Sequence, residues 1–432
     1  MNYAQVFHNH RFAVVGLGKA GLPAARALKC LGADVFVWDD FAPSRDAAEG
    51  FTVLRPHDIN KPLDALVLSP GIPHKLPTPH PEAAWASANH IPILTDAELL
   101  YRAVRGSASK AKFVGITGTN GKSTTTALLA HILAVANVPH AAGANLGPAA
   151  LSLPLLPDNG VYVLEMSSYM LERLIETRFD VAIMLNLSPD HLDRHGDMAG
   201  YAMAKREIFS RQKAGCTAII GMDDPASRAM AAWLHTQPAN VVEISSKTHI
   251  TGPALALPGA HNAQNAAAAT AAARALGVSE PAITEGIRTY PGLPHRQAQI
   301  AAVHGIRFIN DSKATNADAA SRAMACYDHF IWIAGGIAKA GGIAPLAPLF
   351  PRIHKAFLIG QDAASFAETL NKHNVPHDIV GTLDAAVPLA HQAARATGTE
   401  IVLLSPAAAS FDQFSSFEQR GDYFTALAKA IV

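Results

Sequence analysis

The sequence predicts an α/β protein built on mainly parallel sheets, and three observations predict it. Short apolar runs, such as residues 12–15 and 113–117, alternate with Ala-rich helical stretches along most of the chain. At 432 residues, the chain is too long for one ordinary core. Its residues are 49% hydrophobic and 16% charged, so it can bury large cores and is not a disordered chain.

The expected elements follow this alternation, and two junctions interrupt it. The expected strands cover residues 12–15, 35–38, 65–68, 113–117, 161–165, 181–185, 218–221, 308–311, 330–334, 356–359 and 401–404. The expected helices include residues 22–31, 122–135, 201–211, 262–276 and 317–327. A small-residue, basic stretch near residues 91–112 and a Pro/Gly-containing stretch near 290–297 indicate connections between domains. We therefore expect three domains, at residues 1–94, 95–295 and 296–432.

Charge and cysteine content exclude several classes of protein. Lys plus Arg equals Asp plus Glu, at 35 each, whereas proteins that bind nucleic acid or acidic membranes carry a basic excess. Cys30, Cys216 and Cys326 are far apart and form neither a metal-binding spacing nor a disulfide framework. No signal-peptide pattern opens the chain, and no window approaches the roughly 18 apolar residues of a membrane span. We expect a cytoplasmic protein that binds neither nucleic acid nor membrane.

A glycine-rich loop, Gly16-Leu-Gly18-Lys-Ala-Gly21, separates the first expected strand from the first expected helix. Glycines there permit a tight turn and let backbone N–H groups approach a diphosphate at the helix N-terminus. Asp39 and Asp40 end the next strand, about where an acid that binds ribose lies. The pattern favours a nucleotide-diphosphate site over a merely tight turn.

A second loop, Gly115-Ile-Thr-Gly118-Thr-Asn-Gly121-Lys122-Ser123-Thr124, lies at another strand-to-helix junction. Its successive amides can surround phosphates, Lys122 can reach the β- and γ-phosphates, and Ser123 can bind Mg²⁺. The strict motif has glycine six residues before the lysine, where this chain has Ile116, so the loop is a variant. It still predicts triphosphate binding.

Two residues downstream could complete a metal site beside this loop. Glu165 closes an expected strand, where a carboxylate would point towards the phosphate loop, although acids at strand ends are also common on surfaces. His191 follows another strand end, and a loop histidine alone is more often structural or solvated than a ligand.

Lys205 carries a stronger signal because it shares a helix face with Tyr201, Ile208 and Phe209. A lysine on an apolar face either extends its amine to solvent or has a specific role. Desolvation favours the neutral amine, which can react with CO₂ to form a carbamate and so become an oxygen ligand for a metal.

Polar residues also gather after expected strands in the last third of the chain. Asp311 ends one expected strand and Lys313 and Thr315 follow it, at the edge where α/β proteins build sites. Arg296 lies at a domain junction, where it could bind phosphate. Two later segments, which contain Lys339 and Ser410, could line a pocket for a small anion, although ordinary loops explain them equally well.

Taken together, the motifs resemble the Mur ligases. The segments that carry the resemblance are GITGTNGKST, LEMSSYMLE, LNLSPDHLDRHG with YAMAKREIF, GAHNAQNAAAA, GLPHR, INDSKATN and LLSPAAASFDQFSSFEQRG. The last two, with GLGKAG and SPGIPH, resemble the branch of the family that adds D-glutamate. The resemblance implies a Rossmann-like N-terminal domain for the UDP part, a central P-loop ATPase-like domain and a Rossmann-like C-terminal domain.

The resemblance also implies roles for individual residues. For the UDP-substrate it implies Gly18, Lys19, Ala20, Asp39, Gly71, Asn145 and His191. For ATP it implies Gly118, Thr119, Asn120, Gly121, Lys122, Ser123, Thr124, Asn262, Asn265, Arg296 and Asp311. For two Mg²⁺ ions it implies Ser123, Glu165, His191 and a carbamylated Lys205. For D-glutamate it implies Lys313, Thr315, Lys339, Ser410, Phe411 and Phe417. The catalytic group would be Lys122, Glu165, His191 and Lys205.

The expected reaction is amide ligation in peptidoglycan precursor synthesis, by a monomer. ATP would phosphorylate the L-alanyl carboxylate of UDP-N-acetylmuramoyl-L-alanine, and the amine of D-glutamate would attack the acyl phosphate. Three alternatives remain: a sister ligase acting on another UDP-muramoyl intermediate or on folate, a nicotinamide-dependent dehydrogenase, and a P-loop regulator without catalytic activity. The dehydrogenase would leave the GTNGKST loop unused, and the regulator would need no amino-acid pocket.

Overall fold

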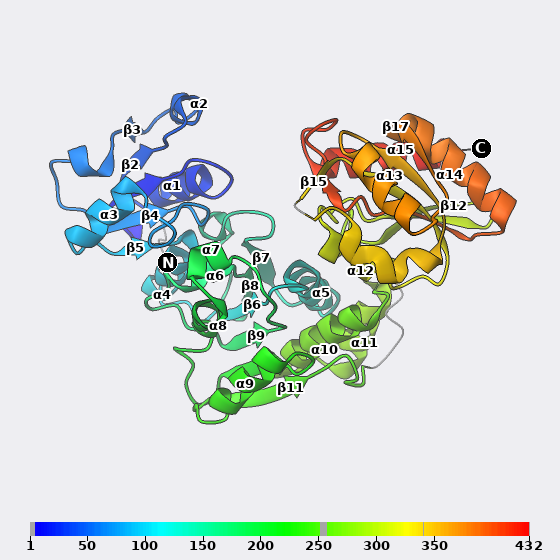
Figure 1. Cartoon of the computed structure of the whole chain (residues 1–432). Helices are drawn as coiled ribbons and strands as arrows, with labels where there is room; N and C mark the ends of the chain where they lie inside the picture. Colours follow the sequence, from blue (N-terminus) through cyan, green and yellow to red (C-terminus); the bar gives the residue numbers. More distant parts are fainter. Residues whose placement is uncertain (1–4, 251–256, 340, 432) are drawn as a thin grey trace. The chain divides into compact units, whose positions relative to one another are not determined.

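The computed structural model describes residues 5–250, 257–339 and 341–431. The chain divides into two compact units (Figure 1). The first comprises Met1–Ala254 and Asn262–Tyr290, and the second comprises Leu255–His261 and Pro291–Val432. The first unit contains two large sheets and the second contains one, so each of the three predicted domains has one large sheet. The exact domain boundaries stay a prediction.

The first sheet is parallel, with strand order β3-β2-β1-β4-β5. Its strands are β1 (Arg11–Val15), β2 (Asp34–Trp38), β3 (Thr52–Val53), β4 (Ala65–Leu68) and β5 (Ile93–Leu94). Its helices are α1 (Gly21–Cys30), α2 (Ala42–Asp46), η2 (Pro56–Asp58), α3 (Pro81–Ala88) and α4 (Asp96–Gly106). The chain order reverses at β1, so the loops after β1 and β4 meet where parallel sheets bind ligands.

The second sheet is parallel as well, with strand order β11-β10-β9-β6-β8-β7. Its strands are β6 (Lys112–Thr117), β7 (His140–Ala144), β8 (Val161–Glu165), β9 (Val181–Met184), β10 (Thr217–Gly221) and β11 (Asn240–Ile244). Its helices are α5 (Lys122–Val135), η3 (Ala150–Ser152), α6 (Ser168–Leu171), α7 (Leu192–His195), α8 (Met198–Arg206), α9 (Pro225–Leu234), α10 (Ala260–Ala275) and α11 (Glu280–Thr289). Here the order reverses at β6, which leads into the phosphate loop.

The third sheet has the order β12-β13-β18-β14-β16-β17, with β12 antiparallel and the other pairs parallel. Its strands are β12 (Ala298–Val303), β13 (Ile306–Asn310), β14 (Phe330–Gly335), β16 (Ile353–Ile359), β17 (His377–Gly381) and β18 (Ile401–Leu404). Two short strands, β15 (Ile337–Ala338) and β19 (Ala408–Ala409), pair separately. The helices are α12 (Ala317–Met324), η4 (Ala344–Arg352), α13 (Ala363–Lys372), α14 (Leu383–Thr397) and α15 (Phe417–Lys429).

Strand burial and helix caps explain why these segments fold as they do. All residues of β4, β8 and β18 are buried, as expected for strands covered on both faces. Asp224, Asn316 and Ser416 each accept a hydrogen bond from the backbone N–H three residues later and so begin α9, α12 and α15. Each such cap contributes about 1 kcal/mol to stability.

The predicted fold class is confirmed, with corrections at element ends. The helix predicted over residues 201–211 ends at Arg206, and the one predicted over 317–327 ends at Met324. The strand predicted over 308–311 is Ile306–Asn310, which leaves Asp311 just beyond it. The burial predicted around Lys205 is confirmed: Tyr201, Lys205, Ile208 and Phe209 are all at most 2% exposed, although the last two lie beyond the helix.

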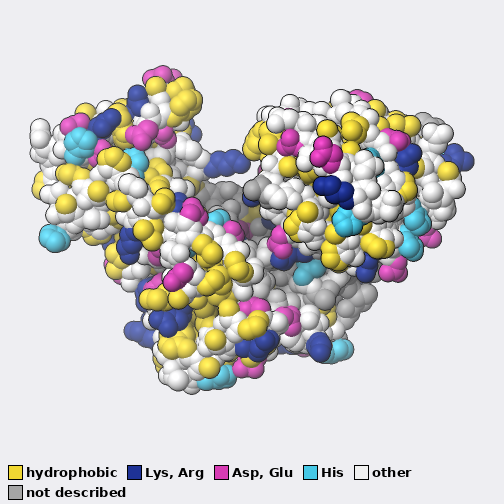
Figure 2. Space-filling view, viewed as in Figure 1, with side chains coloured by type: hydrophobic (Ala, Val, Ile, Leu, Met, Phe, Trp, Pro, Cys, Tyr) yellow, Lys and Arg dark blue, Asp and Glu magenta, His cyan; other side chains and the backbone are white. Residues whose placement is uncertain are grey.

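The surface carries charges of both signs. On the visible face, acidic and basic side chains are interspersed over both units (Figure 2). Within the described parts of the chain, every helix is too short or too polar to span a membrane.

Candidate active site

The loop between β6 and α5 has the conformation that its glycines predict. Gly118 and Gly121 have φ angles of +151° and +85°, which favour glycine. A Cβ on Gly121 would lie 2.2 Å from Asn265 Oδ1, so a side chain there would collide with α10. Asn265 in turn donates to Asn262 Oδ1 at 3.1 Å. The two predicted asparagines therefore lie directly beside the predicted phosphate loop.

Asn186, just after β9, fixes this loop and was not predicted from the sequence. Its Oδ1 accepts from the Asn120 backbone N–H at 2.9 Å, and its Nδ2 donates to the Asn120 carbonyl at 3.1 Å. The Thr119 N–H donates to the Asn186 carbonyl at 2.9 Å. The sequence offered one signal for Asn186, its position after a buried strand. Its hydrogen bonds with Asn120 depend on the tertiary fold and leave no pattern in the sequence.

Two lysines converge on one carbonyl of the loop. Lys122 Nζ donates to Gly118 O at 2.9 Å and to Thr119 O at 2.9 Å. Lys205 Nζ donates to Gly118 O at 2.8 Å and to Thr117 Oγ1 at 3.3 Å. Burial, and secondarily the charge of Lys122, lower the pKa of Lys205 well below its usual value. The site therefore favours a neutral amine on Lys205.

Glu165 lies at the end of β8, next to β6, as predicted. Its Oε1 accepts from Asn145 Nδ2 at 2.6 Å, so Asn145, which was predicted to contact the UDP-substrate, holds the carboxylate in this state. Its Oε2 is buried without a hydrogen-bond partner among the described residues. A buried carboxylate oxygen without a donor is costly unless a cation neutralises it.

His191 lies at the more exposed rim of this region. It has a φ of +54° and begins α7, and its ring centroid is 5.0 Å from that of Tyr169. Desolvation lowers the pKa of His191, although the charge of Asp190 acts in the opposite direction. The lowered pKa favours the neutral imidazole, which is the form that binds metals.

The donor set fits Mg²⁺ in part. The unpartnered Glu165 oxygen is the observation in its favour, and hydroxyl and carboxylate oxygens are suitable ligands. Within the described residues, no group of three or more His, Cys, Asp or Glu could hold a metal. A complete site therefore requires oxygen from Ser123, from a modified Lys205 or from bound phosphate.

The N-terminal glycine loop is closed by close backbone contacts. A Cβ on Gly21 would lie 1.7 Å from the Gly16 carbonyl oxygen, so only glycine fits there. Ser69 Oγ donates to the same oxygen at 2.7 Å and joins this loop to the one after β4. Gly18, Lys19 and Gly71, all predicted to bind the UDP-substrate, are exposed at these two loops.

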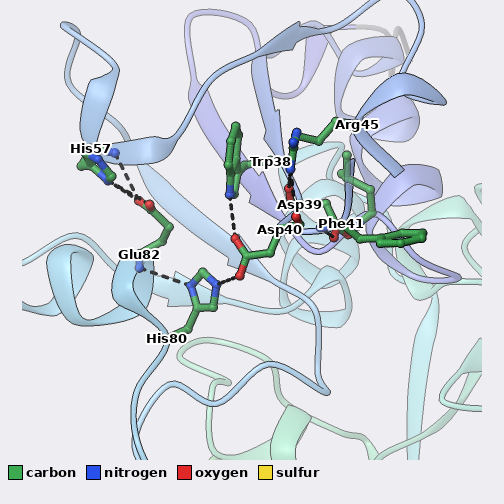
Figure 3. Close-up of polar contacts among 9 residues, drawn as sticks. Trp38, Asp39, Asp40, Phe41, Arg45, His57, His80 and Glu82 are labelled. Carbon is green, nitrogen blue, oxygen red and sulfur yellow. Dashed lines mark hydrogen bonds and ion pairs between the residues drawn. The ribbon is translucent and has the colours of Figure 1, made fainter. Parts of the chain in front are cut away.

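Asp39 supports the glycine loop from the end of β2. Its Oδ2 accepts from the Leu17 N–H at 2.6 Å and its Oδ1 accepts from the Phe41 N–H at 2.9 Å. Arg45 Nη1 donates to the carbonyls of Asp39 and Asp40 at 2.7 and 2.9 Å (Figure 3). Both carboxylate oxygens of Asp39 therefore accept hydrogen bonds from backbone groups of the protein.

Asp40, the next residue, is held by a different set of hydrogen bonds (Figure 3). Its carboxylate accepts from Trp38 Nε1 at 3.1 Å and contacts His80 Nε2 at 3.0 Å. Because His80 Nδ1 accepts from the Glu82 N–H, the proton of a neutral His80 lies on Nε2. These two donors, His80 first, lower the pKa of Asp40. Phe41 beside them is 65% exposed.

In the second unit, the predicted ATP residue Asp311 is buried. Its Oδ2 accepts from Ser405 Oγ at 2.7 Å, and its Oδ1 accepts from the Gln297 N–H at 3.2 Å. Desolvation outweighs these hydrogen bonds and raises the pKa of Asp311 to about 7. The positive charge of Arg296 acts in the opposite direction and lowers the pKa of Asp311.

The predicted D-glutamate residues gather at the same edge of the third sheet. Lys313 Nζ lies 3.8 Å from the centroid of the Phe417 ring, a cation–π contact. Strands β15 and β19 pair Ile337 with Ala409, which brings the segments containing Lys339 and Ser410 side by side. Ser410 is buried, Lys339 is exposed, and Phe411 is 71% exposed.

Arg420 connects these segments and was not singled out from the sequence. It is 1% exposed, and its guanidinium donates to Ser312 Oγ, to Ser312 O and to Ala408 O at 2.8 to 3.1 Å. Its acceptors are mainly backbone carbonyls from two segments far apart in the sequence, so no sequence pattern reveals them.

Similar proteins support the family that the motifs indicate. The Mur ligase middle domain matches residues 116–255. The UDP-N-acetylmuramoylalanine–D-glutamate ligase of Paramagnetospirillum magneticum is 48% identical, over 97% of this chain and 96% of that protein. The enzyme of the same name from Caulobacter vibrioides is 46% identical, over 98% and 97%.

Solved structures support the fold. The UDP-N-acetylmuramate-alanine ligase of Thermotoga maritima has a TM-score of 0.60 and 17% identity, and covers 98% of this chain and 99% of that one. From these matches, the chain belongs to the Mur ligase family, with the UDP-N-acetylmuramoylalanine–D-glutamate ligases as its relatives.

Proposed function

We propose that this ATP-dependent ligase joins D-glutamate to UDP-N-acetylmuramoyl-L-alanine in peptidoglycan precursor synthesis. The observation that carries this proposal is 48% identity over nearly the whole length of a relative with that name. We also propose the three-domain division at residues 94 and 295, a monomeric state and action in the cytoplasm.

The reaction proceeds through an acyl phosphate. The L-alanyl carboxylate attacks the γ-phosphorus of ATP and ADP leaves. The amine of D-glutamate then attacks the acyl carbon, and the tetrahedral intermediate collapses to amide and phosphate. The chain's task is to hold the reactants in line and to offset negative charge.

The loop from Gly118 to Thr124 binds the ATP phosphates. Lys122 Nζ donates to two carbonyls of this loop, and on ATP binding its ammonium turns to the β- and γ-phosphates. Asn262 and Asn265 lie against the loop and limit where the nucleotide can sit. We also assign Arg296 and Asp311 to ATP, as the resemblance to the family implies.

Ser123, Glu165, His191 and a carbamylated Lys205 hold the Mg²⁺ ions. When bound, Mg²⁺ neutralises charge on the transferring phosphoryl group. The unpartnered Glu165 oxygen and the lowered pKa of Lys205 support this assignment. Carbamate formation adds CO₂ to the neutral amine and releases one proton, which converts the amine into a carboxylate-like group.

The two remaining substrates bind at the other sheet edges. We assign the UDP-substrate to the residues named for it above, which lie on the loops after β1, β2 and β4 and at Asn145 and His191. We assign D-glutamate to Lys313, Thr315, Lys339, Ser410, Phe411 and Phe417. The exposed loop glycines and the paired segments near Lys339 and Ser410 support these assignments.

The decisive experiment measures ADP release with UDP-N-acetylmuramoyl-L-alanine and a panel of D- and L-amino acids. We expect release to depend on D-glutamate. Preference for another amino acid or another muramoyl substrate would favour a sister ligase. ADP release that does not depend on the added amino acid would favour a P-loop regulator, and NAD binding would favour a dehydrogenase.

A further inference from the structure

We infer that Arg173 is a positioning residue that holds the UDP-substrate loop, residues 69–74, in its binding conformation. This inference rests on the proposed function of that loop. Arg173 follows α6 next to the second sheet, whereas the loop follows β4 of the first sheet. Both belong to the same compact unit.

The contacts of Arg173 go almost entirely to this loop. Its Nη1 donates to Leu68 O at 2.9 Å and to Ser69 O at 3.3 Å, and its Nη2 donates to Ile72 O at 2.6 Å. Its Nε donates to His74 Nδ1 at 3.2 Å. A single planar guanidinium therefore fixes both ends of a six-residue turn, which a lysine ammonium cannot do.

Arg173 is a buried cation rather than a surface residue. It is 3% exposed. His74 also lies 3.4 Å from Glu172, but its Nδ1 accepts from Arg173 and so cannot donate to that carboxylate. Burial, and secondarily the charges of Arg173, Lys75 and Arg194, lower the pKa of His74 to about 3, so its ring is neutral.

A second arginine holds the same turn from another side. Arg194, on α7, donates to Gly71 O at 2.9 Å, and its guanidinium lies 4.3 Å from the Tyr169 ring centroid. Gly71, the predicted substrate contact, thus lies between the two anchored ends of the loop. Because Ser69 also donates to Gly16 O, Arg173 and Arg194 together hold both loops of the proposed UDP site in place relative to one another.

The test compares Arg173→Met, Arg173→Lys and the control Arg211→Met. Arg211 donates to Thr177 O and Glu207 in the same region of the second sheet and makes no contact with residues 69–74. We expect Arg173→Met to raise the KM and Kd for the UDP-substrate about tenfold, with kcat and the KM for ATP within about twofold. Arg173→Lys should recover only part of this loss, and Arg211→Met should change neither constant.

Unchanged affinity of Arg173→Met for the UDP-substrate would overturn the inference. A uniform loss of all activities with a lowered Tm would also overturn it, since this is what a purely structural role predicts. If Arg173→Met does not fold, Arg173→Lys decides by the same KM-against-kcat comparison. Failure of the wild-type protein to bind UDP-N-acetylmuramoyl-L-alanine would instead overturn the proposed function.

Discussion

Lys122 and Lys205 donate hydrogen bonds to the same acceptor, the carbonyl oxygen of Gly118, at 2.9 and 2.8 Å. Two ammonium groups this close repel one another, and Lys205 is the one that is fully buried. Burial, and secondarily the charge of Lys122, lower the pKa of Lys205, so this buried amine loses its proton more easily than an exposed lysine. The two lysines are suited to opposite tasks: one supplies positive charge and the other can become negative.

Lys122→Ala should lower turnover on the order of a hundredfold or more, because it removes the mobile charge at the transferring phosphate. Binding of the UDP-substrate should change much less, since most of the residues proposed for it lie on loops of the first sheet. ADP release and calorimetric titration with UDP-N-acetylmuramoyl-L-alanine measure the two quantities. Lys112→Ala, at the exposed start of β6, is the control. Near-normal ligation by Lys122→Ala would contradict the phosphate-loop assignment.

If Lys205 is carbamylated, as proposed, Lys205→Ala should be folded but nearly inactive, because it lacks the carbamate oxygens. Acetate or formate should partly restore activity by filling the vacated space with carboxylate oxygens. With ¹³C-bicarbonate, NMR should show a carbamate signal in the wild type and in the control Lys213→Ala, which alters an exposed lysine, but not in Lys205→Ala. Full activity in CO₂-free buffer without a carbamate signal would exclude the modification.

The sequence predicted the fold class because the central strands are apolar runs between Ala-rich helices. Strands at 65–68, 161–165 and 401–404 have the predicted bounds. β7, with sequence HAAGA, was missed because Ala and Gly have low strand propensity. β17, with sequence HDIVG, was missed because it is a polar edge strand. Tertiary pairing, rather than local preference, forms these two strands.

At the candidate site, strand ends and loop spacing predicted which residues would lie near one another. Lys122 and Lys205 meet at Gly118, although they lie 83 positions apart in the sequence, because the predicted phosphate loop and α8 meet at one sheet edge. Asn186, Arg173 and Arg420 were missed for a common reason. Their partners are mostly backbone groups, which leave no pattern in the sequence.

Amino-acid selection should depend on charge. If Lys313 and Lys339 hold carboxylates, D-glutamate should be used about a hundredfold better than D-glutamine or D-alanine, since a site built for a charged group rejects its neutral analogue. Lys339→Met should reduce the difference between D-glutamate and D-glutamine, and Lys372→Met, at the end of α13, should not. Competition assays of kcat/KM measure this ratio. Equal rates with D-glutamine in the wild type would show that the pocket is elsewhere.

The buried carboxyl of Asp311 should make the second unit less stable as the pH rises from about 4 to about 7. Its pKa is raised from 3.8 to about 7, so the folded state keeps a proton that the unfolded state has lost between these values. The free energy of unfolding therefore falls as pH rises through this window, by up to roughly 4 kcal/mol above pH 7. Asp311→Asn cannot ionise, and its amide can still pair with Ser405. In scanning calorimetry, its Tm should rise relative to the wild type between pH 5 and pH 8, whereas the exposed Asp328→Asn should show a constant difference. A constant difference for Asp311→Asn would mean that Asp311 is ionised throughout.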